Sequence, residues 1–118
     1  MEALSVGMYI RTNYGKIDKI LKLNKSYVKG VSQKDELYSY DIDNIVKASY
    51  NIIDILEVGD IISYSDEKHE ILLIDDELMV RNTGLIYDNN YYLPIKSITI
   101  KSVITHEQME QMAYKVVE

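Results

Sequence analysis

The stretch Val58-Gly59-Asp60-Ile61-Ile62-Ser63-Tyr64 decides the fold, because it reads as the opening of a β-strand in the middle of the chain. A similar stretch stands near the start, Val6-Gly7-Met8-Tyr9-Ile10-Arg11-Thr12, 52 positions earlier. The similarity continues downstream at nearly the same spacing. The pattern predicts that a second copy of a small unit follows a first, and such internal repetition determines the fold class.

The repeat can be followed residue by residue along the chain. At a spacing of 52, the matches are Val6 and Gly7 with Val58 and Gly59, Ile10 with Ile62, Ile20-Leu21 with Leu72-Leu73, Val28-Lys29 with Val80-Arg81, and Tyr40 with Tyr92. At a spacing of 53, the matches are Ile42, Ile45 and Ser49 with Ile95, Ile98 and Ser102. Chance similarity among strands that are rich in Ile is the competing explanation.

Short apolar runs separated by Gly, Asn, Asp and Ser predict mostly β-structure. In the first half we expect strands at 6–11, 16–23, 27–31 and 37–40, a short fifth element around 45–46, and a short helix within 49–56 that Ser49 or Asn51 caps. Two of these segments have an alternative: the apolar spacing after Lys16 also fits a helix, and residues 49–56 could equally form a strand. In the second half we expect strands at 61–64, 70–74, 78–81, 85–87 and 91–93, with a turn at Asp75-Asp76-Glu77. The alternation from Ile95 to Ile104 predicts one long strand.

The C-terminal segment carries a helix signal. Thr105-His106-Glu107-Gln108 has the form of a capping box, which predicts a helix from about His106 to Met112. Ala113 to Val117 reads as a last strand.

Composition favours a folded protein without disulfide bonds. The chain has 118 residues, of which 47% are hydrophobic, and it contains no Cys. Thiol catalysis, disulfides and thiolate metal sites are therefore excluded, and a reducing cytoplasm suits the chain. We see no signal peptide and no apolar run near the roughly 20 residues that span a bilayer, so we expect no membrane association.

The negative charge lies in the second half of the chain. Residues 1–56 carry eight Lys/Arg and seven Asp/Glu, whereas residues 57–118 carry five and twelve. Binding of duplex DNA depends on basic side chains that neutralise phosphates, so this balance argues against it. The two halves would present different electrostatic fields to a partner.

Three stretches carry a resemblance to a known group of proteins. They are Val6 to Ile20, Ser49 to Asp60, and Ile104 to Met109 continuing through Tyr114-Lys115-Val116. They resemble small uncharacterised proteins that phages and prophages of low-GC Gram-positive bacteria encode. The resemblance implies a phage early-gene setting in a host cytoplasm, and it brings no activity or functional residues. Strands that open with Val-Gly-x-Tyr/Ile also look like small SH3-like barrels.

We therefore predict a mainly β protein with two tandem small SH3-like barrels or curved antiparallel sheets, each followed by a short helix. The first unit would cover residues 1–56, and the second would cover residues 57–118.

No set of residues in the sequence predicts catalysis, and we expect no cofactor and no metal. His69 stands among Asp66, Glu67 and Glu70, a grouping more typical of a solvated turn than of a metal site. His106 is most simply a residue of the first helical turn. The turn at Asp75-Asp76-Glu77 lacks the ligand spacing of a calcium loop.

Basic and aromatic side chains form the candidate binding surface. Lys16, Lys19 and Lys22 belong to a basic stretch that also includes Lys25 and Lys29, with Tyr14 and Tyr27 beside it. All 11 aromatic residues are Tyr, and Tyr38, Tyr40, Tyr91 and Tyr92 fall in matching regions of the two halves. Such groups bind single strands or nucleotides by charge and stacking, but strand lysines more often form a solvated face.

Three functions remain open at this point. The first is a non-enzymatic phage protein that binds a host protein and inhibits an antiviral defence, of which anti-CRISPR activity is one form. The second is a protein that sequesters a nucleotide-like signalling ligand, with a homo-oligomer left open. The third is a nucleic-acid-associated regulator of phage replication.

Overall fold

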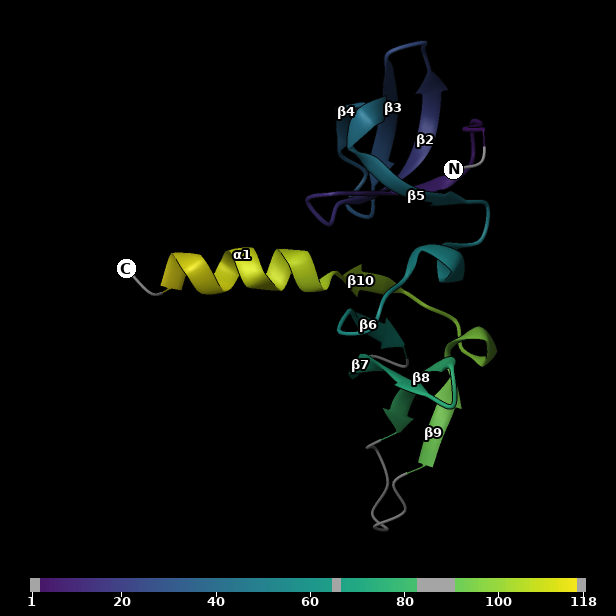
Figure 1. The fold of residues 1–118 in the computed structure, drawn as a ribbon, viewed down its shortest axis with the longest axis vertical. Helices are drawn as coiled ribbons and strands as arrows, with labels where there is room; N and C mark the ends of the chain where they lie inside the picture. Colours follow the sequence, from purple (N-terminus) through teal and green to yellow (C-terminus); the bar gives the residue numbers. More distant parts are fainter. Residues whose placement is uncertain (1–2, 65–66, 83–90, 117–118) are drawn as a thin grey trace. The chain divides into compact units, whose positions relative to one another are not determined.

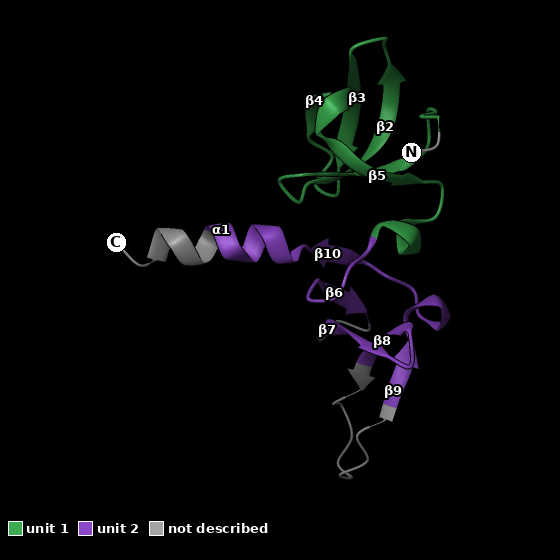
Figure 2. Ribbon diagram, in the orientation of Figure 1, with its two compact units in different colours: residues 1–55 green, residues 56–118 purple. Residues whose placement is uncertain are grey.

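The chain folds into two compact units, residues 1–55 and 56–118 (Figure 2). The computed structural model describes residues 3–64, 67–82 and 91–116, without the side chains of residues 67, 81, 82, 91 and 112–116. The strand expected at Leu85–Tyr87 lies outside the described residues. Both units are β-structures, as predicted (Figure 1).

Unit 1 contains one antiparallel sheet of five strands. The strands are β1 (Tyr9–Thr12), β2 (Ile17–Leu23), β3 (Tyr27–Ser32), β4 (Leu37–Asp41) and β5 (Ile45–Ser49). Their order in the sheet is β4-β3-β2-β1-β5. A 3-10 helix, η1 (Ile42–Asn44), joins β4 to β5, and a second, η2 (Ile52–Ile55), ends the unit. The short helix predicted within residues 49–56 is therefore present as a 3-10 turn, and the Asn51 side chain accepts a hydrogen bond from the Ile53 amide at 3.2 Å.

Unit 2 repeats this arrangement with its own five strands. The strands are β6 (Ile61–Tyr64), β7 (Glu67–Ile74), β8 (Glu77–Asn82), β9 (Tyr91–Pro94) and β10 (Ser102–Ile104), in the order β10-β6-β7-β8-β9. A 3-10 helix, η3 (Ile95–Ser97), joins β9 to β10, and α1 (His106–Val116) follows. In both sheets the fourth and fifth strands are edges, so among the described residues neither sheet closes into a barrel through strand pairing. The barrel form of our prediction is replaced by two open sheets.

The start of each unit shows the same set of backbone hydrogen bonds. Gly7 and Gly59 both have positive φ, 95° and 93°, a conformation that glycine adopts without strain. The Gly7 amide donates to the Ile20 carbonyl at 2.9 Å, and the Gly59 amide donates to the Ile71 carbonyl at 3.0 Å. The amides of Ile20 and Ile71 then donate back, each at 2.8 Å, to the carbonyls of Met8 and Asp60.

These contacts correct two of the sequence matches. Ile20 corresponds to Ile71 and not to Leu72, because Ile71 makes the equivalent backbone hydrogen bonds at the start of unit 2. Ser49 corresponds to Ile104 and not to Ser102, because Ser49 pairs with Tyr9 and Ile104 pairs with Ile61. A spacing of 52 fits only the first strands, since the connections between successive strands, from the first one on, differ in length between the units.

The predicted strand from Ile95 to Ile104 is wrong over most of its length. Residues 95–97 form η3, in which the Ile98 amide donates to the Ile95 carbonyl at 3.4 Å, and only Ser102–Ile104 pairs with β6. The Ser97 hydroxyl also donates to the Pro94 carbonyl at 2.7 Å. Of this segment, η3 and β10 each place one apolar residue in the core, Ile95 and Val103.

The C-terminal helix begins where the capping box predicted and ends later. The Gln108 amide donates to Thr105 Oγ1 at 3.3 Å, and the Thr105 amide donates to Gln108 Oε1 at 3.2 Å. Helix α1 continues to Val116, so the last strand expected at residues 113–117 is wrong for the described residues through 116. In the part of the chain that the structure describes, no helix is both long enough and apolar enough to cross a membrane.

Candidate functional site

A buried carboxylate is the most unusual feature of unit 1. Asp18 lies in β2, paired with Ile10 of β1 and Ser32 of β3, and only 2% of it is exposed. Gly30, which pairs with Ile20, lies diagonally across from Asp18 in β3, and an added Cβ there would lie 2.8 Å from the Asp18 Cβ. The missing side chain of Gly30 therefore creates the space in which the Asp18 carboxylate lies.

The Asp18 carboxylate has one hydrogen-bond partner. The Tyr40 hydroxyl donates to Asp18 Oδ2 at 2.8 Å, whereas Asp18 Oδ1 is buried and accepts no hydrogen bond from the described part of the chain. Burial raises the pKa of Asp18, and the Tyr40 hydrogen bond and the Lys16 charge partly oppose that rise. Burial and the bond to Asp18 also raise the pKa of Tyr40, so its hydroxyl stays protonated as a donor.

A second tyrosine and a lysine lie next to this pair. The Tyr38 and Tyr40 rings are 6.3 Å apart between centroids, with 43° between their planes. The Tyr38 hydroxyl donates to Glu36 Oε2 at 3.1 Å, a bond that raises the pKa of Tyr38. Lys16 Nζ lies over the Tyr38 ring, 4.9 Å from its centroid. We call Lys16, Asp18, Glu36, Tyr38 and Tyr40 the Asp18 cluster.

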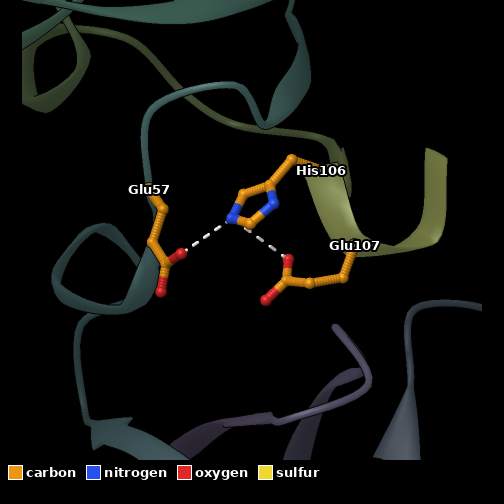
Figure 3. Close-up of side chains that lie close together, drawn as sticks. All are labelled: Glu57, His106 and Glu107. Carbon is orange, nitrogen blue, oxygen red and sulfur yellow. Dashed lines mark hydrogen bonds and ion pairs between the residues drawn. The ribbon is translucent and has the colours of Figure 1, made fainter. Parts of the chain in front are cut away.

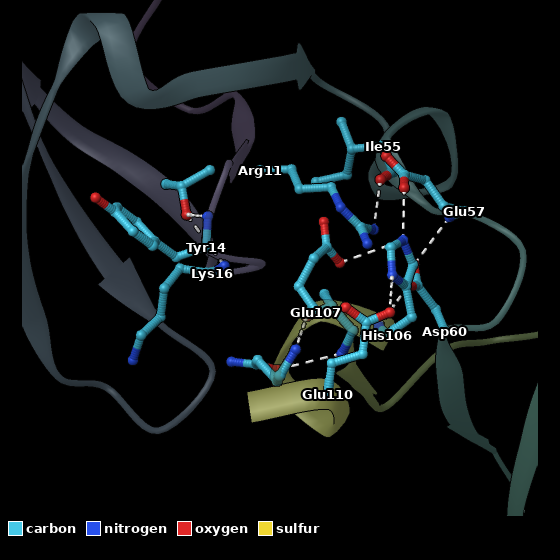
Figure 4. Close-up of polar contacts among 12 residues, drawn as sticks. Arg11, Tyr14, Lys16, Ile55, Glu57, Asp60, His106, Glu107 and Glu110 are labelled. Atoms are coloured by element: carbon cyan, nitrogen blue, oxygen red, sulfur yellow. Dashed lines mark hydrogen bonds and ion pairs between the residues drawn. The ribbon is translucent and has the colours of Figure 1, made fainter. Parts of the chain in front are cut away.

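The backbone holds Lys16 at the end of the turn between β1 and β2. The buried hydroxyl of Thr12 accepts hydrogen bonds from the Tyr14 amide at 3.3 Å and the Lys16 amide at 3.1 Å (Figure 4). This turn therefore presents the Lys16 side chain at the start of β2, two residues before Asp18. The side chain of Tyr14 itself is 58% exposed.

The structure brings together only part of the predicted binding surface. Lys16, Tyr38 and Tyr40 meet in the Asp18 cluster. Lys19 lies instead over the Tyr9 ring, with Nζ 5.6 Å from the centroid. The remaining predicted residues in unit 1 are exposed, namely Tyr14, Lys22 and Tyr27. In unit 2, Tyr92 is half-buried in β9 opposite Arg81, and the side chain of Tyr91 lies outside the described residues.

Unit 2 contains a polar network at the start of α1. Asp60 is fully buried, and its two carboxylate oxygens accept hydrogen bonds from the His106 amide at 3.0 Å and the Glu57 amide at 2.8 Å. An anionic acceptor at a helix N-terminus is favourable because free amides and the helix dipole point toward it. Asp60 thus joins α1 to the loop that precedes β6.

Glu57, His106 and Glu107 form the one group in the described part of the chain whose donor atoms could hold a metal ion (Figure 3). His106 Nε2 lies 2.8 Å from Glu57 Oε1 and 3.4 Å from Glu107 Oε1. Ligand atoms of a tetrahedral zinc ion, each about 2.0–2.2 Å from the metal, are about 3.3 Å apart. The 2.8 Å separation is that of a direct hydrogen bond, so this geometry favours a histidine that anchors the helix.

The interpretation of His69 as part of a solvated turn is wrong. His69 lies in β7 opposite Ile62 and is only 5% exposed. Its ring stacks on Tyr64, with 4.5 Å between centroids and 31° between planes. The strand begins earlier than the charged run suggested, at Glu67.

Sequence reasoning missed Asp18, Glu36, Glu57 and Asp60 as members of these polar clusters. One signal could have identified Asp18: Gly30 stands inside a strand pattern, which often marks the close approach of another group. Asp60 belongs to the quoted stretch, but its role depends on an α1 amide that lies 46 positions away.

The fold and the Asp18 cluster define a small, mainly β protein of two five-stranded sheets with a buried carboxylate–tyrosine site. No protein-family model, no curated protein and no solved structure matches this chain.

Proposed function

We propose that this chain is a non-enzymatic binding protein that recognises another protein through the Asp18 cluster of unit 1. The observation that carries the proposal is the pairing of two tyrosine rings with two carboxylates and a lysine ammonium within one sheet. Tyrosine gives large contact area with little loss of conformational freedom, and it is enriched at protein interfaces.

The partner that we propose is a host protein, and the effect is inhibition of an antiviral defence. The support is the resemblance of three stretches to small phage and prophage proteins, together with the acidic balance of residues 57–118. An acidic surface can compete for a host site that normally receives a polyanion.

We also infer that each unit is SH3-like. The support is the shared strand order, with the fifth strand beside the first and a 3-10 turn between the fourth and fifth strands. An experimental structure in which the paired strands of the two units superpose within about 2 Å would support this; different pairings would exclude it.

Capture of partners from infected-host lysate tests the protein-binding proposal. The comparison uses the wild-type chain, Tyr38→Ala and the control Tyr14→Ala, which removes an exposed tyrosine outside the cluster. We expect one partner that the wild type and Tyr14→Ala retain and that Tyr38→Ala loses. A partner retained equally by all three would place the contact elsewhere, and repeated recovery of none would refute the proposal.

Sequestration of a nucleotide-like ligand is the second candidate. Lys16 over the Tyr38 ring favours it, because an ammonium and a stacking surface stand together. Asp18 and Glu36 oppose it, because each accepts a bond from a cluster tyrosine and would repel a phosphate. Native mass spectrometry of protein taken directly from cells separates the two candidates by the mass of a retained ligand.

A further inference from the structure

The Asp18 cluster contains an acceptor that the folded chain leaves unused. Asp18 Oδ1 has no hydrogen-bond partner among the residues that the structure describes, although Asp18 is almost fully buried. A buried acceptor without a partner is destabilising, so its retention in a small sheet calls for an explanation. A bound donor or cation near the carboxylate would supply one.

The tyrosine rings beside it are positioned to receive a cation. Both hydroxyls donate to carboxylates, Tyr40 to Asp18 and Tyr38 to Glu36, which fixes each ring by its polar end. The face of an aromatic ring is electrostatically negative and attracts ammonium groups within about 6 Å of its centroid. Two carboxylates add to this attraction, and an anionic ligand would meet repulsion from both.

The chain itself shows which cation fits. Lys16 Nζ lies 4.9 Å from the Tyr38 centroid, and its charge favours the ionised form of Asp18. A primary ammonium on a flexible aliphatic stem therefore already occupies this position. Lys16 is exposed at the end of a turn, so its side chain can leave without a change in the sheet.

We propose that the Asp18 cluster is a binding site for a lysine side chain of a partner protein, and that Lys16 occupies it in the free chain. This inference rests on the proposed function, since it specifies which group of the partner enters the site. The incoming ammonium displaces Lys16, lies against the Tyr38 ring, and approaches the Asp18 carboxylate.

A small probe tests the site without knowledge of the partner. Nα-acetyl-lysine N-methylamide is titrated into isotopically labelled full-length protein, and the Tyr38 and Tyr40 ring signals are followed by NMR. Nα-acetyl-norleucine N-methylamide, which lacks the charge, is the matched control ligand. An internal competitor reduces the apparent affinity to the fraction of molecules whose site is free. Lys16→Met removes the competitor and is therefore expected to bind the lysine probe about three- to tenfold more tightly than the wild type.

Two further variants identify the binding groups. Tyr38→Leu in the Lys16→Met background is expected to weaken probe binding at least threefold, and Asp18→Asn is expected to weaken it more. Tyr14→Leu, outside the cluster, is expected to leave it unchanged. Amide spectra show whether the Asp18→Asn protein folds. If it does not fold, the test depends on Tyr38→Leu, which is expected to fold because Tyr38 is only half-buried.

Two results would overturn the inference. One is equal perturbation by the lysine and norleucine probes, and the other is no gain in affinity for Lys16→Met. Lysine-probe binding by a chain that captures no host protein would support the site and count against the proposed function. Partner capture that requires Tyr38 without any lysine-probe binding would support the function and refute the lysine site.

Discussion

Replacement of Gly30 by alanine gives a direct test of how the Asp18 site is built. An ideal Cβ at position 30 would lie 2.8 Å from Asp18 Cβ and 3.0 Å from Asp18 Oδ2. Contacts between non-bonded carbon atoms are optimal at about 3.5–4.0 Å. The added methyl group would therefore overlap the Asp18 side chain by the better part of an ångström, and a strand would have to move.

The magnitude follows from two opposed effects. Extra atoms forced into a packed site typically destabilise a protein by about 1–3 kcal/mol. Gly30 is not among the positive-φ glycines, so alanine there incurs no such backbone strain and gains about 0.4–1 kcal/mol by restricting the unfolded chain. We expect Gly30→Ala to lower the free energy of unfolding of unit 1 by about 1.3 kcal/mol, the difference between the middle values of these two effects.

Native-state hydrogen exchange is the appropriate assay, because it reports on unit 1 separately from unit 2. The amides of Ile20 and Val28 lie in strands next to the site and serve as reporters. Lys29→Ala is the matched control, since Lys29 is the exposed neighbour of Gly30 in β3. We expect its effect to remain within about 0.5 kcal/mol of the wild type.

A double-mutant cycle isolates the contact. Asp18→Gly removes the atoms that the new methyl group would meet, so the Asp18→Gly/Gly30→Ala variant should be more stable than the sum of the two single changes predicts. We expect a coupling free energy of at least about 1 kcal/mol, as for residues in direct contact. A Gly30→Ala protein as stable as the wild type, or a coupling free energy near zero, would refute this account of the site.

Four other predictions concern the polar groups. Asp60→Asn is expected to destabilise unit 2 by about 3 kcal/mol in urea unfolding, because charge-assisted bonds to two backbone amides are weakened; a change below 1 kcal/mol would contradict it. Thr105→Ala is expected to cost about 1 kcal/mol and reduce helical circular dichroism, whereas Thr105→Ser should retain both. An NMR titration is expected to give Asp18 a pKa above about 3.9. Because the pKa of Asp18 is raised in the folded protein, its contribution to stability is fully present below the pKa that Asp18 has in the unfolded chain. This contribution is lost as the pH rises through the pKa of Asp18 in the folded protein. A depressed pKa would contradict the burial argument. Zinc chloride is expected to leave the unfolding midpoint unchanged, and a rise that His106→Ala abolishes would establish a metal site.

The positions of the strands along the chain were accessible from sequence because they depend on local signals. Turn residues and short apolar runs located nine of the ten strands at least in part, and the capping box located the start of α1. Asp75 and Asp76 form the turn between β7 and β8 with φ of 52° and 64°, positive values that a two-residue hairpin turn of this kind requires.

Other features depended on contacts that no local pattern encodes. Ile95 to Ser97 forms a 3-10 turn although its residues alternate like a strand, because the chain must turn from β9 to reach the opposite edge of the sheet. The end of α1 was misplaced because residues 113–117 combine a helix former with β-branched residues. Asp18 stands within a basic run of the sequence, and only the pairing of β2 with β3 sets it against Gly30.

Comparison of the two units shows which features of the sheet both units share and which side chains belong to one unit. Asp18 pairs with Ile10 in unit 1, and His69 pairs with Ile62 in unit 2, so the same position of the sheet is buried and polar in both. Each of these polar side chains also lies against a tyrosine, Tyr40 in one unit and Tyr64 in the other. An apolar residue would serve packing better at such a position. A carboxylate attracts a cation, whereas the His69 ring offers no carboxylate oxygen and packs against Tyr64. The two units therefore share one architecture but carry different polar groups at an equivalent point, and we expect a cationic ligand of unit 1 to bind unit 2 more weakly.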